Sequence, residues 1–185
     1  MKQIFSLLFT SLFFFAVPFA CLGQMPTDST YKSCCGLNPV EFSLDEAYLF
    51  VPNVFTPNGD TKNDYFVPYY NKAIIGFDAY FIYTPVGDTL LYSSSRFDPD
   101  NVANTAWNGL LKDGTPHKGP FKYYFTVFLE NGSLYKVEGM ACRVACGPEA
   151  KSLKDKSGCF YPVQYDPVTQ RLDTKKPNDE LDCFK

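Results

Sequence analysis

The sequence predicts an all-β protein, folded as an antiparallel β-sandwich of about seven strands. Phe and Tyr account for 18 and 13 of the 185 residues, against a single Trp, and such aromatic side chains favour strands over helices. Short runs of β-branched and aromatic residues are separated by turn sequences rich in Gly, Pro, Asn and Asp, which is typical of consecutive strands. The length suggests one domain with appendages.

The first segment, residues 1–23, has the features of a secretory signal peptide. Lys2 gives the positive start, an apolar run extends over 4–19, and small residues close the segment. The run is short for a membrane-spanning helix, and no later stretch is apolar enough to span, so we expect no transmembrane span in the mature chain. We expect cleavage after Gly23; in the alternative, Cys21 is kept and carries a lipid anchor.

An N-terminal leader, 24–46, follows and carries two adjacent cysteines, Cys34 and Cys35; its start is polar, and strand-like patches appear at Phe42 and Leu44. Neighbouring cysteines pair with each other only through a strained ring, so each is expected to reach a distant partner. An even number of cysteines in an exported chain predicts up to three disulfides. The candidates are Cys34, Cys35, Cys142, Cys146, Cys159 and Cys183. Many connectivities are open, among them Cys146–Cys159, Cys142–Cys183 and bridges back to the leader.

The stretch Val51–Phe66, VPNVFTPNGDTKNDYF, connects two apolar runs through a tight loop. Pro57 fixes its own φ and Asn58-Gly59 tolerates positive φ, so a turn is expected here. Short polar side chains in such a loop bond nearby backbone N–H groups and hold it rigid. Their oxygens could also serve as ligands for Ca²⁺, the one cofactor that the sequence suggests. The candidate ligands are Asn58, Asp60, Asn63 and Asp64.

Two hairpins are expected after this loop. Residues 73–83 (AIIGFDAYFIY) form the strongest strand candidate, which a tight turn joins to a return strand at 89–92. Residues 93–105 are polar and are expected to be irregular. In the second hairpin, a buried strand at 121–129, whose alternation is imperfect, leads through an Asn-Gly turn into a closing strand at 134–144.

Several segments together resemble one known family, the gliding motility-associated C-terminal domain. They are Pro52–Asp60 with Asn63, Asp64 and Phe66 (its opening signature), Trp107–Gly109 (its Trp-x-Gly element), Gly119–Tyr124 (a strand start) and Lys136–Gly139 (its final strand). The resemblance covers about residues 48–144. It implies an immunoglobulin-like β-domain, over 47–145, on a surface or secreted protein of a Bacteroidetes-type bacterium. In that family the domain serves as a type IX secretion sorting signal (type B) or as a surface-attachment module.

The chain continues past the resembling region into a C-terminal extension, 146–185, that contains three of the cysteines, Cys146, Cys159 and Cys183. Its hydrophobic content is too low for a core of its own. We therefore expect this extension to lie across the sandwich and to be tethered there by disulfides.

Composition and motifs argue against nucleic-acid binding and against catalysis. The formal net charge is −3 and no basic cluster occurs, whereas phosphate neutralisation needs a concentrated positive face. His117 is the single histidine, and the sequence contains no nucleophile elbow, HExxH motif or Gly-rich phosphate loop. A histidine in a surface loop is far more often solvated than catalytic. The protein is therefore expected not to be an enzyme.

Two functions remain open. In the first, the protein is a non-catalytic module exported to the cell envelope or surface. There it binds an outer-membrane or surface protein complex through an exposed edge strand or end loop, and it is linked to type IX secretion or gliding-type machinery. In the second, it is a carbohydrate-binding accessory module that stacks surface glycans on Trp107, Tyr69 and Tyr70. The alternative for Trp107 is a structural plug between two sheets.

Overall fold

The computed structural model describes residues 29–36, 38–180 and 182–184, and it is mostly β with one short α-helix. The predicted signal peptide, its cleavage site and Cys21 lie outside the described residues. The strands are β1 (Glu41–Leu44), β2 (Ala47–Phe50), β3 (Val54–Phe55), β4 (Tyr69–Tyr70), β5 (Ile74–Tyr83), β6 (Leu90–Phe97), β7 (Gly119–Leu129), β8 (Leu134–Arg143), β9 (Tyr165–Asp166) and β10 (Arg171–Leu172). The helices are α1 (Val102–Thr105) and the 3-10 turns η1 (Ser29–Tyr31), η2 (Pro99–Asn101), η3 (Pro148–Leu153) and η4 (Pro162–Gln164).

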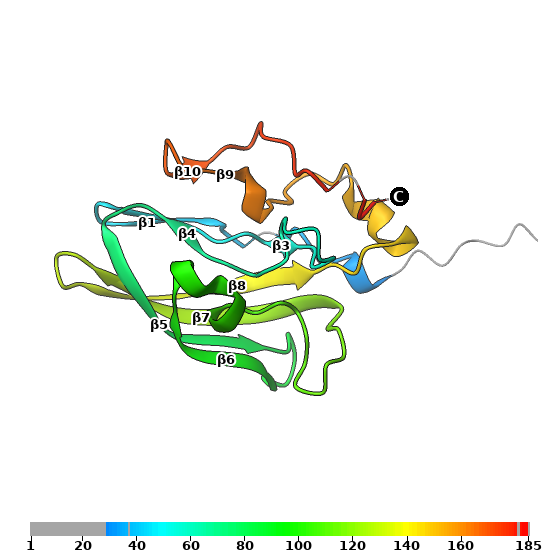
Figure 1. Cartoon of the computed structure of the whole chain (residues 1–185), viewed down its shortest axis with the longest axis horizontal. Helices are drawn as coiled ribbons and strands as arrows, with labels where there is room; N and C mark the ends of the chain where they lie inside the picture. Colours follow the sequence, from blue (N-terminus) through cyan, green and yellow to red (C-terminus); the bar gives the residue numbers. More distant parts are fainter. Residues whose placement is uncertain (1–28, 37, 181, 185) are drawn as a thin grey trace, which may run out of the picture.

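The strands form two main sheets and one small hairpin (Figure 1). The first sheet has the order β1-β2-β4, the second has the order β3-β8-β7-β5-β6, and β9 pairs with β10. Neighbouring strands are antiparallel, except that β3 runs parallel to β8. The main sheets thus have three and five strands, and two of these strands, β3 and β4, are only two residues long.

Both predicted hairpins are confirmed. β5 pairs with β6, and β7 pairs with β8. The second hairpin turns at Asn131-Gly132, where Gly132 has a φ of 84°, a conformation that glycine adopts without strain. The prediction that the return strand ends at Tyr92 was wrong, since β6 continues to Phe97. Serines have little strand preference. Here, however, Ser93 and Ser94 pair with β5 and Phe97 is buried, so the strand extends to Phe97.

The main core lies between the two sheets. In β7 every second residue is buried and the others are partly exposed, so this strand alternates more strictly than its sequence suggested. Its buried side chains meet Leu49 of β2 and the Phe77 and Tyr80 rings of β5 in one hydrophobic cluster. Removing this much apolar surface from water is the dominant favourable term in folding, and it fixes how the two sheets face each other.

Strand β2 is buried on both of its faces, because the C-terminal extension covers the face that points away from the main core. All four of its residues are buried. Leu49 belongs to the main core, whereas Tyr48 and Phe50 alternate with it and point outward. Arg171 of β10 lies 4.9 Å above the Tyr48 ring, and the Tyr48 hydroxyl accepts a hydrogen bond from the Leu172 N–H at 3.0 Å. The extension is thus a third layer over the three-stranded sheet (Figure 1).

Three disulfides tie together the N-terminal segment, strand β8 and the extension. They are Cys34–Cys142, Cys35–Cys159 and Cys146–Cys183. The two adjacent cysteines have distant partners, as expected, and the extension is linked near its end, whereas the pairs Cys146–Cys159 and Cys142–Cys183 do not occur. Multiple disulfides indicate an oxidising, extracytoplasmic location. Among the described residues, no helix has the length and apolar character needed to cross a membrane.

The segment before β2, expected to be an N-terminal leader, takes part in the fold. β1 pairs with β2 over the whole length of both strands. Tyr31 and Cys34 are buried in a second hydrophobic cluster, which also contains Val54, Leu153 and Phe184. This second cluster joins segments from both ends of the described chain.

Gly139 of β8 is a position where a side chain would collide with the core. A Cβ placed there would overlap the ring of Tyr123, which is buried opposite it on β7. We expect Gly139→Ala to lower the free energy of unfolding by about 1–3 kcal/mol, as overpacking does in other cores. The matched control is Gly76→Ala on β5, where an added Cβ meets no atom within 4 Å. Urea unfolding compares the two variants, and equal stability would contradict this packing.

Candidate functional site

The signature loop, residues 56–66, is closed by its own side chains, as the sequence predicted. Asp64 accepts three backbone hydrogen bonds, from Asn58 (2.9 Å) and Gly59 (2.8 Å) through Oδ1 and from Thr61 (2.8 Å) through Oδ2. Asp60 accepts a further one, at 2.9 Å, from the amide two residues on. Gly59 and Thr61 have positive φ values, and these bonds hold the backbone in that conformation.

The four candidate calcium ligands already have hydrogen-bond partners. Besides the carboxylates of Asp60 and Asp64, the Asn58 Oδ1 accepts from the Asp60 N–H at 3.0 Å, and the Asn63 Oδ1 accepts from the Val163 N–H at 2.9 Å. Ca²⁺ takes about six to eight oxygen ligands, so an ion here would have to replace several of these bonds. The calcium site stays a prediction, and the hydrogen bonds favour a structural role for the loop.

Two buried asparagines connect the signature to the C-terminal extension. Asn63 binds Val163, as described, and also donates to the Asn178 carbonyl at 3.1 Å. Asn53 accepts from the Phe160 N–H at 2.8 Å and donates from its side chain to a backbone carbonyl of the extension at 2.7 Å. Both side chains are about 5% exposed, and a buried amide costs free energy unless such bonds are made. The signature therefore holds the extension in place.

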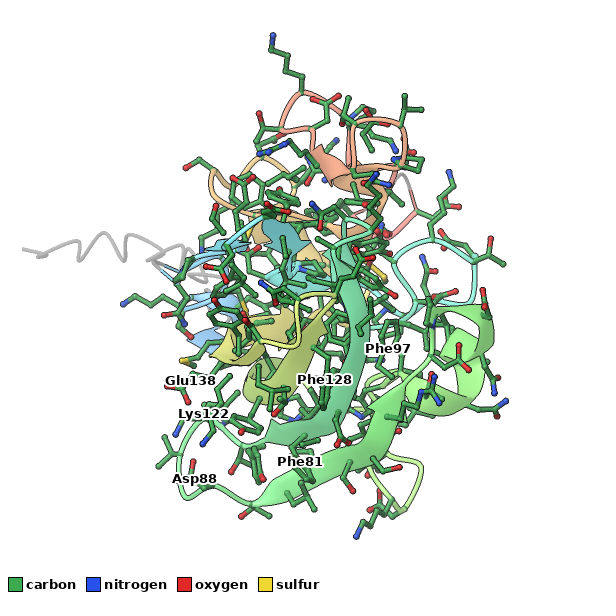
Figure 2. All side chains as sticks on the ribbon, turned by 90° about the vertical axis from the view of Figure 1, so that its left-hand side faces the viewer. Phe81, Asp88, Phe97, Lys122, Phe128 and Glu138 are labelled. Carbon is green, nitrogen blue, oxygen red and sulfur yellow. A yellow bond between two sulfur atoms is a disulfide. The ribbon has the colours of Figure 1, made fainter. Side chains whose placement is uncertain are left out.

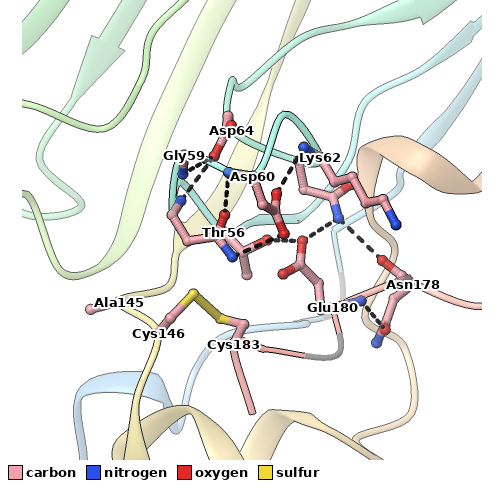
Figure 3. The surroundings of a disulfide bond; sticks show 12 residues. Thr56, Gly59, Asp60, Lys62, Asp64, Ala145, Cys146, Asn178, Glu180 and Cys183 are labelled. Carbon is pink, nitrogen blue, oxygen red and sulfur yellow. Dashed lines mark hydrogen bonds between the residues drawn. A yellow bond between two sulfur atoms is a disulfide. The ribbon is translucent and has the colours of Figure 1, made fainter. Parts of the chain in front are cut away.

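A buried carboxyl, Glu180, lies at the same junction (Figure 3). Its Oε1 accepts hydrogen bonds from the Thr56 hydroxyl and from the Asn63 side-chain amide. Its Oε2 is buried and has no hydrogen-bond partner among the described residues. Burial raises the pKa of this carboxyl; the two hydrogen bonds act against that rise, and the nearby Asp60 and Asp64 carboxylates add to it.

Sequence reasoning missed Glu180. It is one acidic residue among several in a polar extension, and only its burial distinguishes it from the others. The Cys146–Cys183 disulfide lies beside it (Figure 3). These sulfurs are bonded to each other and so are not the thiolates that bind metal ions.

Trp107 lies in the core and not on the surface. It is 1% exposed, its ring packs against Phe55 and Phe121, and its indole N–H donates to the Leu110 carbonyl at 2.8 Å. Its ring offers no surface to a ligand in this structure, and its position is that of a structural plug. His117 packs against it at a ring distance of 5.8 Å. Burial lowers the pKa of His117, so its imidazole is neutral at neutral pH.

Tyr69 and Tyr70, the other predicted binding residues, line a pocket of about 320 Å³, which we call the tyrosine pocket. It lies where the signature loop, β4, the η2–α1 segment and the extension meet. The signature loop supplies Asp64 and Tyr65, and the extension supplies Tyr165. The volume falls within the range of small-molecule sites. The pocket thus brings together part of the predicted metal set and two of the three predicted binding residues.

In comparisons with known proteins, no family model and no curated protein matches this chain. The resemblance to the gliding motility-associated family therefore rests on the quoted residues, and membership of that family stays a prediction. Within this structure those residues have local roles: they close the signature loop, hold the extension and fill the core.

Glu180 predicts a specific pH dependence of stability. Because its pKa is raised in the folded protein, the folded chain binds this proton more tightly than the unfolded chain, in which a glutamate titrates near pH ~4.3. The stability contributed by the protonated form is complete below the unfolded pKa and is lost as the pH rises through the folded pKa. Glu180→Gln, which does not ionise, should therefore lose less stability than the wild type between about pH 4 and pH 7.

Urea unfolding with the disulfides intact, repeated across this pH range, measures the effect. The matched control is Glu138→Gln, at an exposed position of β8, which should follow the wild-type pH dependence. A Glu180→Gln curve that runs parallel to the wild-type curve would show that this carboxyl titrates alike in the folded and unfolded chains.

Proposed function

We propose that the protein is a non-catalytic exported module with an immunoglobulin-like β-sandwich, which binds a protein partner at the cell envelope or surface. Two facing sheets of mainly antiparallel strands support the sandwich. The three disulfides support export. The resemblance of the signature supports a link to type IX secretion or gliding-type surface machinery.

The observation that carries the proposal is the contrast between the outer faces of the two sheets. The extension covers the three-stranded sheet, whereas the five-stranded sheet keeps apolar side chains accessible on its outer face. We call this surface the open sheet face; it consists of Phe81, Tyr83, Tyr124, Phe128, Leu134 and Met140. Leu134 is 61% exposed and Met140 is 37% exposed. Exposed apolar side chains gathered on one surface are typical of interaction sites.

The chemistry of the open sheet face suits a protein partner. The Phe81 ring stacks on the Tyr124 ring across neighbouring strands, at 6.3 Å between centroids and 26° between planes. Charged side chains lie nearby, including Lys122, whose ammonium group is 2.8 Å from Asp88 (Figure 2). The face thus combines aromatic side chains, which are enriched at protein–protein interfaces, with charged side chains that lie among them.

The edge strand β6 offers a second means of attachment beside this face. It is the end strand of the five-stranded sheet and pairs there with β5. Most of its residues are partly or fully exposed, and an unpaired strand edge presents N–H and C=O groups to which an extended segment of a partner can bind.

Partner capture tests the proposal. The tagged protein is cross-linked to the solubilised envelope fraction of the source bacterium, and the bound proteins are identified by mass spectrometry. The double variant Tyr124→Ser/Leu134→Ser removes two apolar anchors and should reduce recovery of the partner about tenfold or more. Treating the fraction with periodate, which destroys glycans, should leave recovery unchanged.

The matched control is Val168→Ser, which replaces a valine that is 89% exposed on the β9–β10 turn of the extension, away from the open sheet face. It should recover the same partner as the wild type. If the Tyr124→Ser/Leu134→Ser variant captures its partner as well as this control, the open sheet face is not the interaction surface.

A further inference from the structure

We propose that the tyrosine pocket binds a neutral sugar residue of a glycan. The pocket is built by the signature loop, β4, the η2–α1 segment and the extension, whereas the open sheet face is built by β5, β7 and β8. The two surfaces therefore belong to different elements, and this proposal does not depend on the proposed protein partner.

The tyrosine pocket presents several hydroxyl groups that are free to bond a ligand. In the described part of the chain, the hydroxyls of Tyr65, Tyr69 and Tyr70 make no hydrogen bond, while the Tyr165 hydroxyl donates to the Tyr70 carbonyl at 2.6 Å. Burial raises the pKa of Tyr69 to about 12, so this phenol stays protonated and can both donate and accept. A ligand with several hydroxyl groups of its own matches this set.

The walls of the pocket are rigid and aromatic. The Tyr69 ring lies 5.0 Å from the Tyr165 ring and 6.1 Å from the Phe50 ring, and the Tyr70 ring lies 4.8 Å from that of Phe77. Packing on this scale fixes the positions of the hydroxyls before a ligand arrives, which lowers the entropic cost of binding.

Tyr65 differs from the other tyrosines of the pocket. It is partly exposed and packs against the edge of the main core, and unlike Tyr69, Tyr70 and Tyr165 it forms no aromatic pair among the described residues. The exposed part of its ring can therefore stack against the apolar C–H face of a sugar, while the hydroxyls of Tyr69 and Tyr70 bond the ring substituents. A combination of apolar lining with a few placed polar groups is usual for small-molecule sites.

The charges around the pocket favour a neutral ligand. Its lining residues include no lysine or arginine, and Asp64 is among them. The carboxylates of Asp100 and Asp98 are close enough to contribute to the raised pKa of Tyr70, whose main cause is burial. This negative surround disfavours phosphate, sulfate and uronic acids. Both Asp64 oxygens already accept backbone amides, which leaves a neutral polyhydroxylated ring as the best match.

Binding to an array of neutral and acidic oligosaccharides tests the proposal, with affinities of the hits measured by calorimetry on the disulfide-intact protein. The wild type should bind one or more neutral glycans and prefer them to acidic ones. Tyr65→Ala should weaken binding about tenfold through loss of the stacking ring, and Tyr65→Phe should keep most of it. Tyr69→Phe, which preserves packing and removes one hydroxyl, should also weaken binding.

The matched control is Tyr135→Ala, at a partly exposed tyrosine of β8 that belongs neither to the pocket nor to the open sheet face; this variant should bind as the wild type does. Three outcomes would overturn the proposal. The first is no binding to any neutral glycan, and the second is equal affinity in Tyr65→Ala and Tyr135→Ala. The third is displacement of a bound glycan by acidic but not by neutral oligosaccharides. Binding of a lysine- or arginine-rich peptide in place of the sugars would assign the pocket to a protein ligand instead.

Discussion

The fold depends on the need to cover strand β2 from both sides. Its run of apolar residues places Leu49 in the main core and leaves Tyr48 and Phe50 on the opposite face. Fully burying a side chain of this size contributes about 1.5–3 kcal/mol, so a two-layer protein would leave a substantial apolar surface in water. The C-terminal extension solves this problem, although it lacks the hydrophobic residues to form a core of its own.

Such a thin third layer needs other attachments, and the structure supplies two kinds. The Cys35–Cys159 disulfide links it to the N-terminal segment, and Cys146–Cys183 ties its end back to its first residue, just after β8. Each native disulfide typically contributes about 2–4 kcal/mol. The buried amides of Asn53, just before the signature loop, and of Asn63, within it, add hydrogen bonds to the extension. As a result one outer face of the protein is closed, the other is open, and a pocket is left where the signature loop, β4 and the extension meet.

The sequence predicted those parts of the fold that depend on local patterns. Turn residues and β-branched runs located both hairpins, and the Asx-rich signature predicted a self-bonded loop. The sequence could not predict the path of the extension. Tyr48 and Phe50 look like ordinary strand residues, and only the structure shows that the extension covers the side of β2 to which they point. The disulfide pairs and the burial of Glu180 are likewise consequences of that path. The sequence also left open whether Trp107 is a structural plug or a platform for a ligand, because this depends on what packs around it. The tyrosine pocket could not be predicted because it combines residues more than a hundred positions apart.

The central claim is that the extension is a tethered layer of the fold, and a tryptic digest of the native, unreduced protein tests it most directly. The three disulfides predict one species in which peptides 33–62, 137–143 and 157–171 are linked together, and a second in which 144–151 is linked to 176–185. Finding both species by mass spectrometry would support the three-layer arrangement. A link between 144–151 and 157–171, or free thiols in the peptides of the extension, would contradict it.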